Sequence, residues 1–349
     1  MKILEDELNR TIKDLISSAK TEEEAEFLVN QIPEKINEIL ESTTKSLLKS
    51  VKLDAYQGGL EEQRKIYEEF KVRNYIRWKD GFDAFELLIS LCIEAGSDLN
   101  EEMRPHAAAT GNLLFDIQTR LHAKACLIAR EIFCLLTNGF ADAAHSRWRA
   151  LHEVTVTAMF LAKSGPEIAV RYSHHEFVDS YKGANQHRKY APRLKAETIS
   201  DEDLASLKSS YDEIISLYGA EFAKPYGWAD QALGKKNVNF SDLELAVALD
   251  HWRPYYKWAS QNIHAGVKTI RTSLGTTDTT DDLLLVGSSD SGMADPGHSA
   301  AISLSQITLT LLAISPNVDN TVMMKMISIL STEVGEAFLK AHKAAKNNS

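Results

Sequence analysis

The stretch NLLFDIQTRLHAKACLIAREIFCLLTNGFADAAHSRWRALHEVTVTAMFLAKSGP, residues 112–166, decides the fold class. Apolar residues recur in it at helical spacing, and its breakers, Asn138-Gly139 and Ser164-Gly165-Pro166, are typical of helix ends. Two long helices joined by one or two residues must lie antiparallel or nearly so. Pro166 then opens a third helix towards Tyr190. The sequence therefore predicts an all-α bundle with residues 112–190 as its core.

Residues 1–110 are predicted to form an N-terminal helical arm, and residues 111–349 to form the bundle domain. Charge clusters alternate in the arm with apolar residues at helical spacing. Thr21, followed by three glutamates, is a capping box for a helix that we expect to end before Pro33. Gln57-Gly58-Gly59 is the best candidate for a hinge. The arm should therefore contain several amphipathic helices.

Further helices are predicted in the C-terminal half. Ser200 opens one helix that reaches about Tyr218. Ser241 and Glu244 form a capping box that opens a long helix reaching roughly Val267. These helices would pack on the 112–190 core.

A change of composition separates these helices from the last two. Thr, Asp, Ser and Gly dominate from Gly275 to Gly297 around one apolar island, residues 283–286, which we predict to be a short strand or a packed loop. Asp295-Pro296 and Ser315-Pro316 each place a cap residue before a proline. The final two helices are therefore expected at roughly 297–314 and 316–345.

The charge balance limits the choice of partners. Lys and Arg number 39 and Asp and Glu number 49, which gives a formal net charge of −10. Non-specific binding of nucleic acid or of an anionic membrane by the whole surface is therefore disfavoured, and only a local basic groove stays open as a binding surface for RNA.

Cysteine usage and apolar runs indicate the compartment. Cys92, Cys126 and Cys134 are odd in number and form no CxxC pair, which argues against a disulfide framework and a cysteine-built zinc site. The opening MKILEDELNR lacks the apolar stretch of a signal peptide, and the run at 307–314 is too short to cross a bilayer. We therefore expect a cytoplasmic protein that does not enter a membrane.

Several catalytic signatures are missing from the sequence. It contains no Walker loop, no GxGxxG after a strand, no HExxH and no GxSxG elbow, so nucleotide hydrolysis, hydride transfer, zincin proteolysis and hydrolase-type acyl transfer lose support. His175 and Asp179 form an i, i+4 pair of the metal-ligand type, but two ligands do not make a site. We expect neither a metal nor a cofactor.

The segment AHSRWRALHEV concentrates polar groups on a helix that is otherwise lined with small and apolar residues. His145, Arg149, His152 and Glu153 share one face, and Arg149 can reach Glu153. An arginine forks onto a phosphate and a histidine exchanges protons near neutral pH, so this face can hold a phosphodiester. The alternative is an Arg–Glu ion pair that fixes helix packing.

Arg147 and His152 follow the Arg-x4-His pattern, which resembles the motif of the HEPN ribonucleases, small helical proteins that cut RNA without metal. Residues five apart on an unbroken helix point about 140° away from each other. Convergence of the two side chains needs a dimer or a distorted turn, and the resemblance implies a site at a dimer interface. In it, Arg147 binds the scissile phosphate and His152 moves the proton of the RNA 2′-OH.

A second resemblance rests on Arg149-Ala150-Leu151-His152-Glu153 and on the later Ser260-x-x-x-His264. Over roughly residues 115–315 the chain resembles a bacterial all-helical family known as domain of unknown function 5677. This resemblance implies that Arg149, Glu153, Ser260 and His264 meet in one polar pocket between helices. The alternative for His264 is a structural histidine whose hydrogen bonds are satisfied.

The run KGANQHRKYAPRLK, residues 182–195, carries five basic residues and no acid. Arg188, Lys189 and Arg193 can clamp a phosphate backbone there. The alternative is a solvated helix end, where the helix dipole favours cations.

Two functional hypotheses follow. The first is a metal-independent RNA endonuclease acting as a phage-defence or toxin effector, with Arg147 or Arg149 on the phosphate and His152, assisted by His264, as acid and base. The second is a non-catalytic helical interaction or sensor protein, whose polar residues tie helices together or bind a small anionic ligand. In that second case the N-terminal helices dock a protein partner, and both hypotheses include a homodimer.

The two hypotheses predict different geometries. The enzyme requires Arg147 or Arg149 within hydrogen-bond range of His152 or His264, with an opening to solvent. The interaction protein requires the same polar groups to be saturated by one another and closed off.

Overall fold

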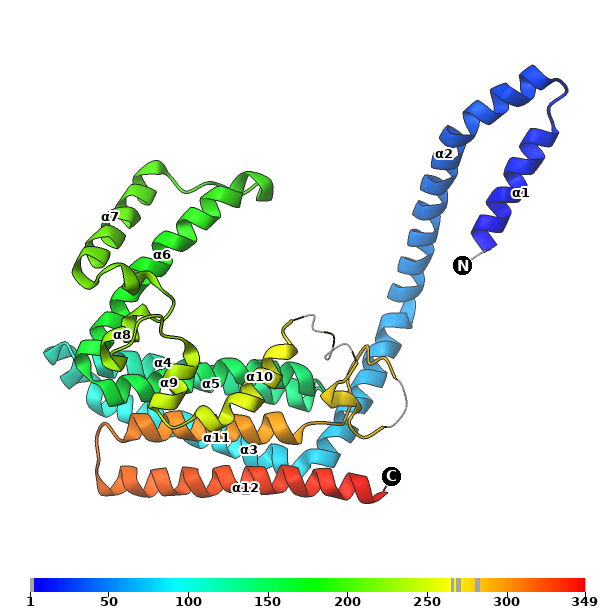
Figure 1. The fold of residues 1–349 in the computed structure, drawn as a ribbon. Helices are drawn as coiled ribbons and strands as arrows, with labels where there is room; N and C mark the ends of the chain where they lie inside the picture. The colour runs from blue at the N-terminus through cyan, green and yellow to red at the C-terminus, as the bar shows by residue number, and fades with distance from the viewer. Residues whose placement is uncertain (1–2, 265–266, 268–270, 280–282, 349) are drawn as a thin grey trace. The chain divides into compact units, whose positions relative to one another are not determined.

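The computed structural model describes residues 3–264, 267, 271–279 and 283–348 of the chain. Regular structure across these residues is helical and includes no strand (Figure 1), which confirms the all-α prediction. No helix in the described part of the chain is long and apolar enough to cross a membrane. The backbone contacts divide the chain into two compact units, residues 1–70 and 71–349.

The first unit is built from helices with little core of their own. The side chain of Thr21 accepts a hydrogen bond from the Glu24 backbone N–H at 3.2 Å, as the capping box predicted. α1 contacts α2, and their half-buried apolar residues include Leu8 and Ile32. The elements are α1 (Ile3–Ser17), α2 (Glu22–Asp54), the π-helical turn η1 (Ala55–Gly59) and the first turns of α3 (Leu60–Thr110).

α2 continues through Pro33, so the prediction that a helix ends before this proline is wrong. A proline removes one backbone donor and crowds the carbonyl four residues earlier. That carbonyl belongs to Val29, which is exposed, so water can satisfy it. The helix therefore tolerates the proline on its solvated side.

The segment predicted as a hinge forms η1 between α2 and α3. Gly58 adopts φ 139°, a value that residues with a Cβ rarely adopt. The backbone therefore departs from α-helical geometry at the predicted position, but it does not form a loop there.

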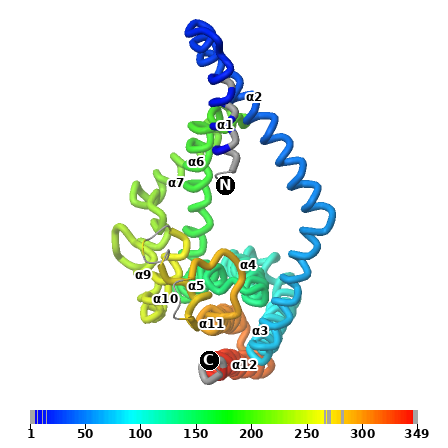
Figure 2. The backbone as a smooth tube through the Cα atoms, turned by 90° about the vertical axis from the view of Figure 1, so that its right-hand side faces the viewer, coloured from blue at the N-terminus to red at the C-terminus, as the bar shows by residue number. Residues whose placement is uncertain are grey.

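The core of the second unit is the predicted antiparallel hairpin. α4 (Leu113–Thr137) and α5 (Ala141–Ser164) are joined by Asn138–Phe140 and pack along their length. α11 (Ala294–Leu312) packs on both of them, and α12 (Val318–Asn348) packs on α11. Figure 2 shows α11 lying between the α4–α5 pair and α12.

α3 belongs to this core from Lys71 onward. Trp78, Phe82 and Phe85 are fully buried. Phe82 contacts Phe133 of α4 and Phe338 of α12, with ring centroids 6.2 and 5.8 Å apart. The compact units therefore divide within α3, whereas the sequence prediction placed the boundary at residue 110.

A second helical hairpin follows α5. α6 (Pro166–Leu194) opens at the predicted proline and packs beside α7 (Asp201–Tyr218), as Figure 1 shows. The Ser200 side chain caps α7 through the Asp203 backbone N–H at 3.0 Å. The short elements η2 (Ala220–Ala223), η3 (Gly227–Ala229) and α8 (Asp230–Leu233) follow.

The single long helix predicted from Ser241 to Val267 is wrong. The chain forms α9 (Phe240–Ala246), the turn η4 (Asp250–Trp252) and α10 (Arg253–Gln261) instead. Asn239, not Ser241, is the cap residue of α9, with Asp242 as its reciprocal partner. Ala248 ends the helix because it adopts φ 60°, a left-handed value.

The apolar island at residues 283–286 is an irregular segment rather than a strand, and Leu284 and Val286 are largely exposed instead of packed. α11 begins at Ala294, so that Pro296 lies in its first turn. The last two predicted helices are therefore present with bounds shifted by a few residues.

Candidate functional site

α5 carries half of the predicted site residues, and α9 and α10 pack against it. His152 is 1% exposed, and its Nε2 lies 3.0 Å from Oε1 of the fully buried Glu244 on α9. The Arg253 guanidinium of α10 lies 2.7 Å from the other oxygen of Glu244, an ionic contact without hydrogen-bond geometry. Glu244 therefore joins a histidine and an arginine from two different helices.

A second set of contacts lies beside the first. Arg149 Nε donates to Glu153 Oε1 at 3.1 Å, and the Tyr256 hydroxyl donates to the same oxygen at 2.5 Å. The Arg149 guanidinium also stacks 5.0 Å from the centre of the Tyr256 ring. Burial and the neighbouring Glu153 carboxylate raise the pKa of Tyr256 above its usual value, so this hydroxyl stays protonated and remains a donor.

We call these residues the α5 cluster: Arg149, His152 and Glu153 of α5, Glu244 of α9, and Arg253 and Tyr256 of α10. Its two guanidinium groups face its two carboxylates, so the formal charges of these four groups cancel. The side chains of Arg149 and Arg253 are 27% and 24% exposed, while His152 and Glu244 are closed off. The His152–Glu244 pair of the α5 cluster is therefore closed off, whereas Arg149, Glu153 and Arg253 pair within the cluster and stay partly exposed.

Acid–base catalysis needs a group within hydrogen-bond reach of the substrate proton. His152 is covered by Glu244 and by the rings of Phe240 and Tyr256, whose centroids lie 5.9 and 6.0 Å from the imidazole. A substrate could reach this imidazole only after α9 or α10 moves. In this arrangement His152 orients the buried carboxylate of Glu244.

Arg147 points to a different side of α5. Its Nε donates to the carboxylate of Glu131 on α4, whereas His152 faces α9. Arg147 and His152 therefore do not converge within one chain. A second copy does not remove the difficulty, because the chain's own helices cover His152.

His145 is an aromatic core residue. Its ring stacks on Trp148 with centroids 5.5 Å apart and meets Trp258 edge-on at 4.8 Å. Burial lowers the pKa of His145 to about 4, so the imidazole is neutral at pH 7. Neither ring nitrogen has a hydrogen-bond partner among the described residues. The predicted role in holding substrate would require this side chain to leave the core.

The four residues Arg149, Glu153, Ser260 and His264 were expected to share one pocket. Arg149 and Glu153 do meet, but Ser260 Oγ donates to the Tyr256 carbonyl of its own helix at 2.7 Å. His264 lies exposed in the turn after α10, and its backbone N–H donates to the Gln261 carbonyl. Tyr256, one helical turn before Ser260 on α10, makes the contact with Glu153 that was expected of Ser260.

The predicted basic stretch lies at the end of α6, where its cations are exposed. Arg188 pairs with Asp201 at 2.5 Å, and the Lys189 ammonium lies 5.2 Å from the Tyr190 ring. Arg193 lies in the last turn of α6. This arrangement matches a solvated helix end favoured by the dipole.

The metal-ligand pair is engaged in hydrogen bonds. His175 Nδ1 lies 3.4 Å from Asp179, and its Nε2 lies 2.9 Å from the Lys224 carbonyl. Within the described residues, no group of three or more His, Cys, Asp and Glu side chains is placed to hold a metal ion.

Sequence reasoning missed Glu244 as a partner of His152. The sequence prediction used Glu244 as the fourth residue of a capping box, but Asp242 fills that role. Phe240, Leu243 and Glu244 lie on one buried face of α9. A carboxylate at an apolar position of this face was the available signal, because a buried charge needs a partner.

Residues 115–282 match the model of a family of unknown function, DUF5677. The match covers just under half of the chain and includes α5, α9 and α10, which carry the α5 cluster. The match supports the resemblance to this family. It does not support the resemblance to the HEPN ribonucleases. No curated protein and no solved structure matches the chain.

Proposed function

We propose that this chain is a non-catalytic helical interaction protein that associates with a second copy of itself through its first unit. The observation that carries the proposal is the exposure of α2, which runs for 33 residues without one buried side chain. Exposed apolar surface of this extent is typical of an interaction site. The α5 cluster then holds α5, α9 and α10 together rather than performing chemistry.

Four exposed apolar residues of α2 lie on one stripe, on which the half-buried Ile36 also falls. Val29, Leu40 and Val51 are spaced by eleven residues, which is about three helical turns, so they lie above one another. Leu47 falls on the same stripe, seven residues after Leu40. All four are exposed. The neighbouring face, which includes Leu28, is half-buried where α1 contacts α2.

The charges of α2 select the orientation of the second copy. The N-terminal half is acidic and the C-terminal half is basic, so an antiparallel pair places opposite charges together and a parallel pair places like charges together. The acidic residues are Glu22, Glu23, Glu24, Glu26, Glu34, Glu38 and Glu41, against Lys35; the basic residues are Lys45, Lys49 and Lys52, against Asp54.

A two-fold axis near Leu40 satisfies both patterns. Val29 of one copy then faces Val51 of the other, and Leu40 meets its own counterpart, as expected of a self-complementary interface. Lys45, Lys49 and Lys52 lie more than about 100° around the helix from Leu40, so they act on the acidic half of the opposite α2 at long range and not by direct contact. Burial of the apolar stripe supplies the driving force and sets the register, and the charges favour the antiparallel orientation.

The first test is the oligomeric state in solution, measured by analytical ultracentrifugation. We expect a dimer for the wild type and a monomer for the double variant Leu40→Glu, Leu47→Glu. Leu217→Glu on α7 is the matched control, because Leu217 is 63% exposed and Leu40 52%, but it lies outside the first unit. A monomeric wild type, or a double variant that remains dimeric, would refute the proposal.

Disulfide cross-linking tests the orientation, in a Cys134→Ser background because Cys134 is the exposed cysteine. A mixture of Val29→Cys chains and Val51→Cys chains should form mixed disulfides, since Cβ atoms about 4 Å apart can be bridged. Disulfides that form only between identical Val29→Cys chains would indicate a parallel pair and contradict the charge argument.

Cleavage of RNA tests the non-catalytic half of the proposal against the ribonuclease hypothesis. Total RNA is incubated with the protein in excess EDTA, beside His152→Ala and Arg147→Ala, with melting curves for all three. We expect no cleavage by any of them. Cleavage by the wild type that is lost in folded variants would establish a metal-independent ribonuclease instead.

A further inference from the structure

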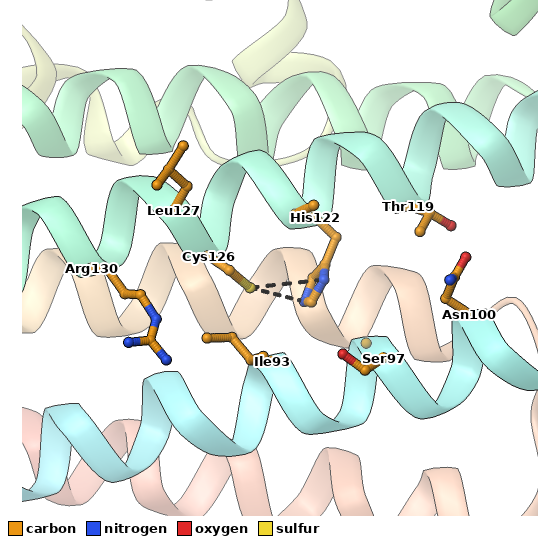
Figure 3. Close-up of a pocket in the computed structure, with 10 residues that line it drawn as sticks. Ile93, Ser97, Asn100, Thr119, His122, Cys126, Leu127 and Arg130 are labelled. Atoms are coloured by element: carbon orange, nitrogen blue, oxygen red, sulfur yellow. Dashed lines mark hydrogen bonds between the residues drawn. The ribbon is translucent and has the colours of Figure 1, made fainter.

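A pocket of about 390 Å³ lies between α3 and α4 in the second unit, away from the α5 cluster (Figure 3). Its size falls in the range of small-molecule sites. α3 contributes Ile93, Gly96, Ser97 and Asn100, and α4 contributes Thr119, His122, Ala123, Cys126, Leu127 and Arg130.

The floor of this pocket is uncharged at neutral pH. His122 is 4% exposed and its burial lowers the pKa to about 4, while burial raises the pKa of the Cys126 thiol to about 12. The Cys126 sulfur lies 3.7 and 3.9 Å from the two ring nitrogens of His122. A reactive cysteine needs a thiolate, so the pair forms a neutral binding surface rather than a nucleophile and its base.

The hydrogen bonds around His122 fix which ring nitrogen carries the proton. The Thr308 hydroxyl donates to the Leu304 carbonyl at 2.8 Å, so its oxygen accepts from His122 Nε2 at 3.0 Å. The neutral ring therefore keeps a lone pair on Nδ1. A thiol at 3.9 Å is only a weak donor for that lone pair.

Gly96 makes room for this ring. A Cβ at residue 96 would lie 2.3 Å from Cε1 and 2.5 Å from Nδ1 of His122. The imidazole itself therefore fills the space that the missing side chain leaves, and its Cε1 and Nδ1 atoms pack against Gly96.

The two ends of the pocket differ in character. Figure 3 shows Arg130 at one end and Asn100 with Thr119 at the other, with Ile93 and Leu127 between them. Arg130 has no carboxylate within ion-pair distance among the described residues. From Thr119 to Arg130, α4 rises about 16 Å.

The polar end can donate a hydrogen bond. Asn100 Oδ1 accepts from Arg104 Nε at 3.0 Å. The donors that Asn100 can still offer are therefore its amide N–H groups. The Thr119 hydroxyl donates to the Phe115 carbonyl of its own helix at 2.9 Å. Along its length, the pocket thus offers a cation, then an apolar wall and then an amide donor.

We propose that this pocket binds an elongated organic carboxylate with an apolar chain. Arg130 holds the carboxylate through charge-assisted hydrogen bonds, and Ile93 and Leu127 bury the chain. Asn100 selects a polar group further along the molecule, and the neutral His122 and Cys126 side chains form the floor beneath it. The site does not depend on association of the first unit, so either proposal can fail without the other.

Calorimetric titration with octanoate tests the site, with octanamide as the uncharged analogue of the same shape. We expect saturable binding of octanoate that Arg130→Gln weakens about tenfold, because a hydrogen bond to a charged group is lost. Octanamide should bind the wild type and Arg130→Gln equally. Arg120→Gln is the matched control, since Arg120 lies on α4 but does not line the pocket.

A second variant places the ligand in the pocket. Ala123 is an exposed lining residue, so Ala123→Phe fills the space without entering the core and should abolish binding of both molecules. Melting curves confirm that each variant is folded. Absence of saturable octanoate binding, or equal octanoate affinities for the wild type and Arg130→Gln, would overturn the proposal.

Discussion

Two buried histidines, His152 of α5 and His122 of α4, lie on the two helices of one hairpin in opposite chemical settings. His152 contacts a buried carboxylate that is itself held by Arg253, and no opening leads to it. His122 contacts a hydroxyl and a thiol, and it lines a pocket. The same residue type therefore stabilises helix packing in one place and forms a ligand surface in the other, because its neighbours differ.

The largest expected effect is the loss of the carboxylate that joins α5 to α9 and α10. Glu244→Gln leaves Arg253 without its counter-charge and replaces the carboxylate that contacts His152 by an amide. We expect the free energy of unfolding to fall by about 3 kcal/mol, as for other buried pairs that lose one member. Urea denaturation at pH 7 measures the change.

The double variant Glu244→Leu, Arg253→Met provides the control for this prediction. Replacing both charges by apolar groups should recover much of the lost stability, since neither charge is then left alone. A Glu244→Gln variant as stable as the wild type would mean that the α5 cluster does not hold these helices.

The fold was predictable where its signals are local. Asn138-Gly139 marks the α4–α5 turn, and the i, i+4 spacing of Arg149 and Glu153 gives their ion pair. The break after α9 was not predictable, because the left-handed backbone of Ala248 has no local signature in its residue type.

The partners of the two histidines could not be predicted from the sequence, because they lie far away along the chain. Glu244 is 92 residues from His152, and Thr308 is 186 residues from His122. Only packing brings these pairs together. The pocket between α3 and α4 was missed in the same way, since Gly96 has no periodic signal and its importance appears only against the His122 ring.

The second effect in size is the loss of stability in acid that each of two histidines contributes, His122 and His145, because burial lowers the pKa of both to about 4. In the unfolded chain a histidine titrates near 6.5, so between pH 6.5 and 4 the unfolded state binds more protons than the folded state. Stability is therefore complete above pH 6.5 and falls as the pH decreases. Each histidine should contribute a loss of about 2 kcal/mol by pH 5.

Unfolding free energies at pH 7 and pH 5 measure this loss in the wild type and in His145→Phe, which keeps an aromatic ring against Trp148. The variant should lose less stability than the wild type over the same interval. His106→Gln is the control, because His106 is exposed and should leave the pH dependence unchanged. Identical pH dependence in His145→Phe and the wild type would place His145 in a more solvated setting than its burial indicates.

The smallest expected effect is the loss of stability when the ion pair between Arg147 and Glu131 is broken. This pair is partly exposed, whereas Glu244 is buried. Both side chains are partly exposed, at 37% and 42%, so water solvates either charge when its partner is removed. Glu131→Gln should therefore lower the free energy of unfolding by less than about 1 kcal/mol, as is usual for surface pairs. Raising the salt concentration should reduce even this difference, because exposed charges are screened and buried ones are not. A loss as large as that of Glu244→Gln would show that the α4 side of α5 also depends on a buried charge.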